Sequence, residues 1–165
     1  MKKSIILTLI TVVFLLIALA FVFIQNSSVS KALNTQGSIL EEITIDDDTR
    51  LVLYEENDYI KVKGFEKSIY GWKEKGSSSF VVRNKDTAFT LNNIGTFKMD
   101  ENGINILFGF VPSTVESLIL KKENKEINIK VNAYYWYMLG DNKTMDFEEF
   151  RVIYKDGTHK EYPFD

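Results

Sequence analysis

The sequence predicts a mainly β protein: an antiparallel β-sandwich or barrel-like domain preceded by one N-terminal transmembrane α-helix. Residues 5–24 form an apolar run in which only two threonines are polar. From residue 39 onward, short runs of β-branched and aromatic residues alternate with turn residues, and apolar positions recur with a period of two. Because no crossover helix separates these runs, we expect the strands to pair antiparallel.

The apolar run at 5–24 is expected to be a signal-anchor helix. At 1.5 Å per residue it is about 30 Å long, the thickness of the hydrocarbon core of a bilayer. A helix bonds every backbone group within the segment, as lipid requires. The side chains expected to face lipid include Ile5, Leu9, Phe14, Leu16, Phe21 and Ile24.

The charges that flank the run predict its orientation. Lys2 and Lys3 precede it, and the first basic residue on its far side is Lys31. The positive-inside rule therefore places residues 1–4 in the cytoplasm and the bulk of the chain outside the cell membrane.

A cleaved signal peptide is the alternative interpretation of the same run. Ala18-Leu19-Ala20 fits the small-x-small cleavage pattern, and cleavage near Ala20 would give a secreted protein. It would also leave the apolar residues 21–24 at the start of the mature chain. We therefore predict that the anchor is retained.

The remainder divides into a stalk and a domain. Residues 25–38 are small and polar and predict a stalk, in which a short helical turn near 29–33 is compatible with the sequence. Residues 39–165 predict one extracytoplasmic β domain. Its expected strands cover residues 39–45, 51–55, 59–65, 68–73, 80–83, 87–91, 96–99, 104–111, 115–121, 126–139, 150–155 and 158–162. Hairpin signals occur at 100–103, at 122–125 and at Asp156-Gly157.

Composition excludes several classes of function. The chain has 20 basic residues, and without Lys2 and Lys3 the outer part has 18 against 23 acidic ones, a net charge of −5. We therefore expect no nucleic acid partner, because phosphate binding needs a basic patch. With no cysteine and one histidine, a structural zinc site is not expected, and no cofactor is predicted.

The aromatic cluster Tyr134-Tyr135-Trp136-Tyr137 is the leading candidate for partner binding. If the alternation set by Ile127, Ile129 and Val131 continues, Ala133, Tyr135 and Tyr137 face the core, whereas Tyr134 and Trp136 face outward. Such a pair can contact a sugar ring or a protein. The competing interpretation is that a bulge or a second layer makes these residues core, because aromatics are favoured in strands.

Acidic residues give weaker signals. Asp46-Asp47-Asp48 lies between two expected strands and is interpreted as a solvated turn rather than a Ca²⁺ site. His159 follows a hairpin turn, and no nucleophile motif accompanies it. A hydrolase with two carboxylates remains an alternative, because its acids need not be close in sequence.

Four short segments resemble the small membrane-anchored or lipoprotein β domains of unknown function from Bacillus-type Firmicutes. The segments are Gly71-Trp72-Lys73, Phe108-Gly109-Phe110-Val111 with Val115 and Leu118 behind it, Tyr135-Trp136-Tyr137, and Tyr154-Lys155-Asp156-Gly157. The resemblance covers the β domain and implies a location and a fold class, but no activity and no site residue.

Together these observations predict a single-pass, membrane-anchored binding or structural module without enzymatic activity. The expected partners are the membrane and either a cell-envelope glycan or a membrane protein. The alternatives are the carboxylate hydrolase of the cell envelope and a small regulatory or immunity subunit whose helix pairs with a larger membrane protein.

Overall fold

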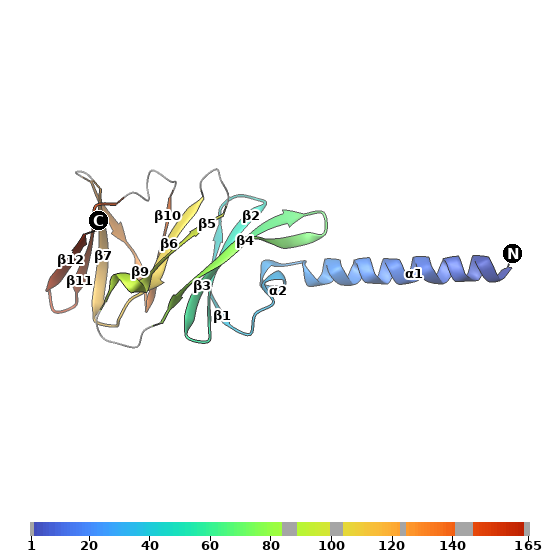
Figure 1. Ribbon diagram of the computed structural model, residues 1–165, viewed down its shortest axis with the longest axis horizontal. Coiled ribbons are helices and arrows are strands. Elements are labelled where there is room, and N and C mark those ends of the chain that lie inside the picture. Colours follow the sequence, from blue (N-terminus) through green and yellow to red (C-terminus); the bar gives the residue numbers. More distant parts are fainter. Residues whose placement is uncertain (1, 84–88, 100–103, 123–124, 141–146, 164–165) are drawn as a thin grey trace.

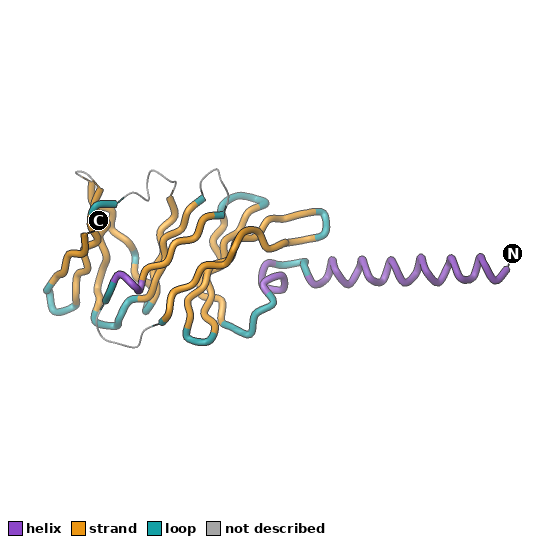
Figure 2. The backbone as a smooth tube through the Cα atoms, in the orientation of Figure 1, coloured by secondary structure: helices purple, strands orange, loops and turns teal. Residues whose placement is uncertain are grey.

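The computed structural model describes residues 2–83, 89–99, 104–122, 125–140 and 147–163 (Figure 1). The chain begins with helix α1 (Lys2–Gln25) and the short helix α2 (Val29–Leu33). Beyond them, the described residues form three four-stranded antiparallel sheets, and strands dominate the domain (Figure 2). The predicted mainly β class is confirmed, as is one N-terminal apolar helix that is long enough to cross a membrane.

In each of the three sheets, neighbouring strands are hydrogen-bonded in a fixed order. Sheet A contains β1 (Ser38–Thr44), β2 (Thr49–Glu56), β3 (Tyr59–Ser68) and β4 (Gly71–Val82). Sheet B contains β5 (Ile94–Lys98), β6 (Asn105–Phe110), β10 (Tyr135–Gly140) and β9 (Val131–Asn132), and the 3-10 turn η1 (Leu91–Asn93) precedes it. Sheet C contains β12 (His159–Pro163), β11 (Glu149–Tyr154), β7 (Val115–Lys122) and β8 (Lys125–Ile129).

The chain completes sheet A first and then passes back and forth between sheets B and C. Sheet A is a simple meander of consecutive hairpins. The chain then enters sheet B, leaves it after β6 to form β7 and β8, returns for β9 and β10, and ends in sheet C. The strands of sheets B and C therefore alternate in pairs along residues 94–163.

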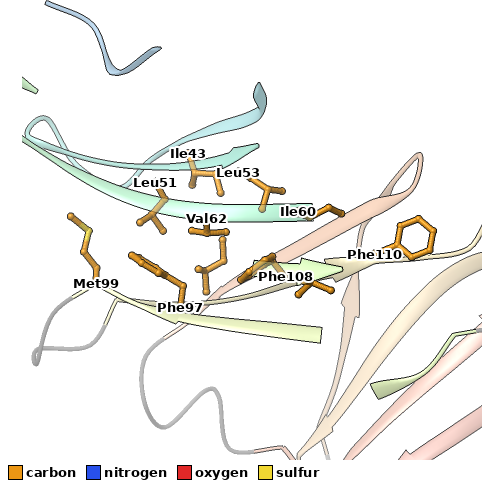
Figure 3. Close-up of a cluster of buried hydrophobic side chains, with 11 residues drawn as sticks. Ile43, Leu51, Leu53, Ile60, Val62, Phe97, Met99, Phe108 and Phe110 are labelled. Atoms are coloured by element: carbon orange, nitrogen blue, oxygen red, sulfur yellow. The ribbon is translucent and has the colours of Figure 1, made fainter. Parts of the chain in front are cut away.

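Sheet B is the middle layer and buries side chains on both faces. Along β6, Phe108 packs toward sheet A, whereas the neighbouring Leu107 packs toward sheet C. Figure 3 shows the first of these interfaces, where Leu51 of sheet A faces Phe97 of sheet B. A strand buried on both faces reads as a continuous apolar run, which is what residues 106–108 show.

A third apolar cluster covers the outer face of sheet A. Val29 and Leu33 of α2, each 3% exposed, pack there against Val52, Tyr54 and Phe65. The Ser28 hydroxyl accepts the Lys31 backbone N–H and caps α2. Within residues 25–38, which we expected to form a polar stalk, α2 therefore packs against the domain, because two apolar residues one helical turn apart cover the sheet.

Several predicted strand boundaries were wrong. The expected single strand at 126–139 is three strands, because the chain is interrupted at Lys130 and reverses at Ala133 and Tyr134. β4 runs on through Gly76, whose φ of +83° fits a register shift opposite β3 rather than a loop. Of the expected strand at 87–91, residues 89–91 are not in a strand and the rest lie outside the described residues, as do the hairpin at 100–103 and residues 123–124 of the next.

Helix α1 extends away from the layered domain (Figure 1). Its span Ile6–Gln25 has a mean hydropathy of 3.1, and none of it is buried inside the structure. At its end, the Asn26 carbonyl accepts the Trp72 backbone N–H at 2.8 Å, which ties the helix terminus to β4.

Candidate functional site

The aromatic cluster does not form the outward pair that the alternation predicted. Trp136 is fully buried between sheets B and C, so its predicted exposure was wrong. The cause is the two-residue turn at Ala133 and Tyr134, in which Ala133 has a φ of +55°. This turn pairs Trp136 with Val131 across the hairpin, and cross-strand partners share a face of the sheet.

Tyr134 lies at the edge between sheets B and A and is half-buried. Its hydroxyl donates to Glu55 Oε2 at 2.6 Å, and the Arg83 guanidinium lies 4.2 Å from its ring centroid. Arg83 also forms an ion pair with Glu55. Burial and the Glu55 hydrogen bond raise the pKa of the Tyr134 phenol, so this hydroxyl is a neutral donor at pH 7.

Tyr135 makes a second link between the same two sheets. Its hydroxyl lies 3.1 Å from the Leu40 carbonyl oxygen and 3.3 Å from Glu41 Oε2. Burial, followed by the charge of Glu41, raises the pKa of the Tyr135 phenol. The polar ends of Tyr134 and Tyr135 are therefore used within the protein, and these residues join layers rather than offering a contact surface.

Carboxylates gather on the outer face of sheet C. Lys121, Glu126, Glu149, Arg151 and Glu161 form this cluster, which we call the sheet C charge cluster. Lys121 Nζ lies 2.6 Å from Glu149 Oε1, and Arg151 Nη2 lies 2.8 Å from Glu161 Oε1. Each carboxylate therefore has a cationic partner on another strand of sheet C.

The electrostatics of these acids do not resemble those of a general acid. Hydrogen bonds from Arg151 and then Lys121 lower the pKa of Glu161. The backbone N–H of Asp48 lowers the pKa of Asp46 in the acidic turn. A general acid for glycoside hydrolysis needs a raised pKa, so these sites do not favour the hydrolase. Within the described part of the chain, no cluster of His, Asp or Glu residues has the composition to hold a metal ion.

A cavity of about 540 Å³ lies where the β11–β12 turn meets the segment between β6 and β7. The described residues that line it are Ser113, Thr114, Tyr154, Lys155, Asp156 and Thr158. The turn is at the end of the domain opposite to α1 (Figure 1). The volume of the cavity falls within the range of small-molecule sites, roughly 300–1,000 Å³.

Backbone hydrogen bonds hold the walls of this cavity in place. The Lys155 N–H donates to the Thr114 carbonyl at 2.9 Å, which joins the two segments that form the cavity. Asp156 Oδ1 accepts the Thr158 N–H at 2.9 Å and the Thr158 hydroxyl at 2.6 Å, and the latter bond is the main reason that the pKa of Asp156 is lowered. Burial raises the pKa of Tyr154, so its phenol stays neutral.

The chemistry of the lining is that of a site for a polar, uncharged ligand. The Ser113, Thr114 and Thr158 hydroxyl oxygens can accept hydrogen bonds, Lys155 can donate, and Asp156 can accept through its second carboxylate oxygen, because Oδ1 already accepts from Thr158. The Tyr154 ring adds an apolar surface. Among the described residues one carboxylate, Asp156, lines the cavity, whereas glycoside hydrolysis generally uses two.

His159 lines a smaller cavity of about 200 Å³ on the outer face of sheet C. Its described neighbours there are Arg151, Ile153 and Gly157. None of these described neighbours is a nucleophile, so none of them could form a nucleophile–base pair with His159.

Sequence reasoning identified the Asp156-Gly157 turn but missed the cavity beside it. Ser113 and Thr114 lie about forty residues before Lys155, and the pairing of β7 with β11 brings them together. No periodicity or motif signals such a contact between two loops. Comparisons of the chain with protein-family models, with curated proteins and with solved structures give no match.

Proposed function

We propose that this protein is a single-pass, membrane-anchored binding module whose β domain lies outside the cytoplasm. The observation that carries the proposal is α1: an apolar helix of membrane-spanning length whose side chains contact none of the described core clusters. The Phe14 side chain, for example, is 74% exposed. So large an exposed apolar surface is stable only when lipid or another apolar partner covers it.

The local structure at the end of α1 supports a retained anchor. The helix continues past Ala20 to Gln25 without a break, and Phe21 and Phe23 are exposed like the residues before them. Cleavage near Ala20 would leave these two rings in water. Lys2 and Lys3 at the other end support a cytoplasmic N-terminus.

Extraction and protease accessibility test the anchor and its orientation. The full chain is expected to stay in the membrane pellet at alkaline pH, and external protease is expected to remove the β domain from intact spheroplasts. A Val13→Arg, Leu16→Arg double variant should release the chain, because each charge near the centre of the span costs about 2.5–3.5 kcal/mol. Full-length chain in the soluble fraction would contradict the proposal.

The cavity beside the β11–β12 turn is our candidate for the binding site, and a cell-envelope glycan is the ligand class that it fits best. A sugar presents hydroxyls that both donate and accept, which suits a lining that combines hydroxyl oxygens, the Lys155 ammonium and the Asp156 carboxylate. The Tyr154 ring can pack against the apolar face of a sugar. In an anchored protein this end points away from the membrane, toward the envelope polymers (Figure 1).

Co-sedimentation of the full chain, in detergent micelles, with insoluble peptidoglycan tests the binding site. Lys155→Ala and Asp156→Asn should each weaken binding about tenfold, the equivalent of about 1.4 kcal/mol. Lys130→Ala is the matched control, because Lys130 is also an exposed lysine but lies outside the cavity lining. Equal loss in all three variants, or no binding by the unmodified chain, would reject the glycan and leave the anchor untouched.

A further inference from the structure

We infer that the tip of the β3–β4 hairpin is a second membrane contact, in which Ile69 and Tyr70 enter the headgroup region of the leaflet where α1 ends. The inference rests on the proposed membrane anchor and goes beyond it. It assigns the hairpin tip a lipid interface as its partner, and it gives the β domain a defined orientation on the membrane.

The tip exposes apolar surface that its own fold does not cover. Ile69 is 83% exposed and Tyr70 is 45% exposed. Hairpin turns usually carry Gly, Asn, Asp, Ser or Pro, because the turn lies in water. A large aliphatic and an aromatic residue at the two turn positions are expected where the turn meets an apolar phase.

The structure places this tip beside the end of the anchor helix. The Trp72 N–H donates to the Asn26 carbonyl at 2.8 Å. Gly71 has a φ of +97°, and a Cβ at that position would lie 2.2 Å from the Asn26 oxygen, so a glycine is required for this approach. Along the axis of α1, the tip reaches the level of the last turn of the helix (Figure 1). If α1 spans the bilayer, its end and the tip lie at the same depth.

The side chains around the tip suit an interface between lipid and water. Tyrosine is enriched there because its ring is apolar and its hydroxyl is polar. Lys73 Nζ lies 5.5 Å from the Tyr70 ring centroid. Lys67 and Lys73 form no ion pair among the described residues and can reach lipid phosphates, whereas Lys63 and Lys75 on the same hairpin pair with glutamates.

The acidic turn at 46–48 limits the electrostatic attraction between the hairpin tip and anionic lipid headgroups. The Asp48 carbonyl accepts the Lys67 N–H, so this turn lies near the base of the tip. Its carboxylates repel anionic headgroups while the two lysines attract them. Ile69 and Tyr70 therefore supply the main interaction, and the contact does not require anionic lipid.

The tip is held in shape before it meets a membrane. The Ser68 hydroxyl donates to the Gly71 carbonyl at 2.9 Å and accepts the Tyr70 N–H at 3.2 Å. Arg50 lies 5.2 Å from the Trp72 ring centroid, and Trp72 packs against the cluster under α2. Because the tip is already ordered, it loses little conformational entropy when it inserts into the headgroup region. Two fixed points, α1 and the tip, would then hold the domain in one orientation.

Because the chain has no cysteine, single labels can test this contact in the full-length protein. Three single-cysteine variants, Phe23→Cys, Ile69→Cys and Lys155→Cys, are labelled with an environment-sensitive fluorophore. Each is reconstituted in phosphatidylcholine vesicles, with and without lipids that carry a spin label near the headgroup. Phe23→Cys reports insertion of α1, and Lys155→Cys is the control at the opposite end of the domain.

The expected result is a blue-shifted emission that the spin-labelled lipid quenches at positions 23 and 69, with neither effect at position 155. Quenching at 23 without quenching at 69 would overturn the hairpin contact and leave the anchor standing. Quenching at all three positions would also overturn it, because the domain would then lie flat on the membrane. No quenching at 23 would reject the anchor, and the hairpin contact with it.

Discussion

The indole ring of Trp136 lies 5.4 Å from the phenyl ring of Phe150, centroid to centroid, inside the layer between sheets B and C. Trp136 lies on β10 of sheet B and Phe150 lies on β11 of sheet C, so this contact joins the two sheets. Gly109 is the cross-strand neighbour of Trp136 on β6 and leaves space on that face. Both rings are completely buried.

Replacing Trp136 by Ala should therefore destabilise the domain by about 3–5 kcal/mol, the usual cost of emptying a buried aromatic site. Urea unfolding of the full chain in detergent micelles measures this loss. Trp136→Phe is the conservative control and should cost clearly less, because a ring remains against Phe150. A loss below about 1 kcal/mol for the Ala variant would mean that the side chain is exposed.

The Tyr134–Glu55 hydrogen bond should contribute measurably to the attachment of sheet B to sheet A. Tyr134→Phe removes the hydroxyl that lies 2.6 Å from Glu55, and we expect a loss of about 1 kcal/mol. A double-mutant cycle with Glu55→Ala, which removes the acceptor, should give a coupling energy of at least about 0.5 kcal/mol. Additive losses would show that the two groups do not interact in solution.

Stability should fall as pH rises above 10. Burial raises the pKa of Tyr54 from 10.0 to about 12, and burial also raises the pKa values of Tyr134 and Tyr135. Between pH 10 and 12 the unfolded chain loses phenol protons that the folded chain keeps, so the free energy of unfolding decreases. Each such group contributes a slope of up to about 1.4 kcal/mol per pH unit.

Tyr54→Phe tests the alkaline prediction. In this variant the decline in stability between pH 10 and 12 should be shallower, because one group no longer titrates. Urea midpoints measured at several pH values give the slope. Parallel pH profiles of the variant and the unmodified chain would show that Tyr54 titrates normally in the folded state.

Gly71→Ala should be more damaging than Gly157→Ala. Both residues have positive φ, so both variants carry strain of about 1–2 kcal/mol. A Cβ at Gly157 would meet nothing within 4 Å, whereas one at Gly71 would meet the Asn26 carbonyl. Amide hydrogen exchange at Trp72 should accelerate in Gly71→Ala alone. Equal exchange rates in the two variants would contradict the close contact between β4 and the end of α1.

The sheet C charge cluster should stabilise the folded domain at low ionic strength and at pH values above the pKa values of its carboxylates. The lowered pKa of Glu161 means that its favourable pairing is complete above the unfolded pKa, near 4.5, and is lost as pH falls through the folded pKa. Arg151→Gln should reduce the melting temperature at neutral pH and low salt. High salt should remove most of the difference, because the Arg151 and Glu161 side chains are 24% and 43% exposed and salt screens charges that water reaches. A difference that persists in high salt would point to packing instead.

Local patterns were sufficient for most of the strands and for the helix. Apolar residues at every second position from 104 to 110 predicted a strand, and residues 105–110 form β6. Asp156-Gly157 lies in the turn between β11 and β12. The pattern at 126–139 misled because the positive φ of Ala133 leaves no signal in the residue type. A turn of two residues then reversed which face each following side chain occupies.

The sequence by itself determined the apolar N-terminal helix, the mainly β class and the antiparallel hairpins. These depend on the hydrophobicity and the turn propensity of neighbouring residues. The tertiary structure alone decided that Trp136 is core, that Thr114 meets Lys155, and that the Ile69–Tyr70 tip lies beside the end of α1. Each of these depends on the pairing of segments far apart in the chain, and a side chain is buried or exposed only once the opposing layer is in place.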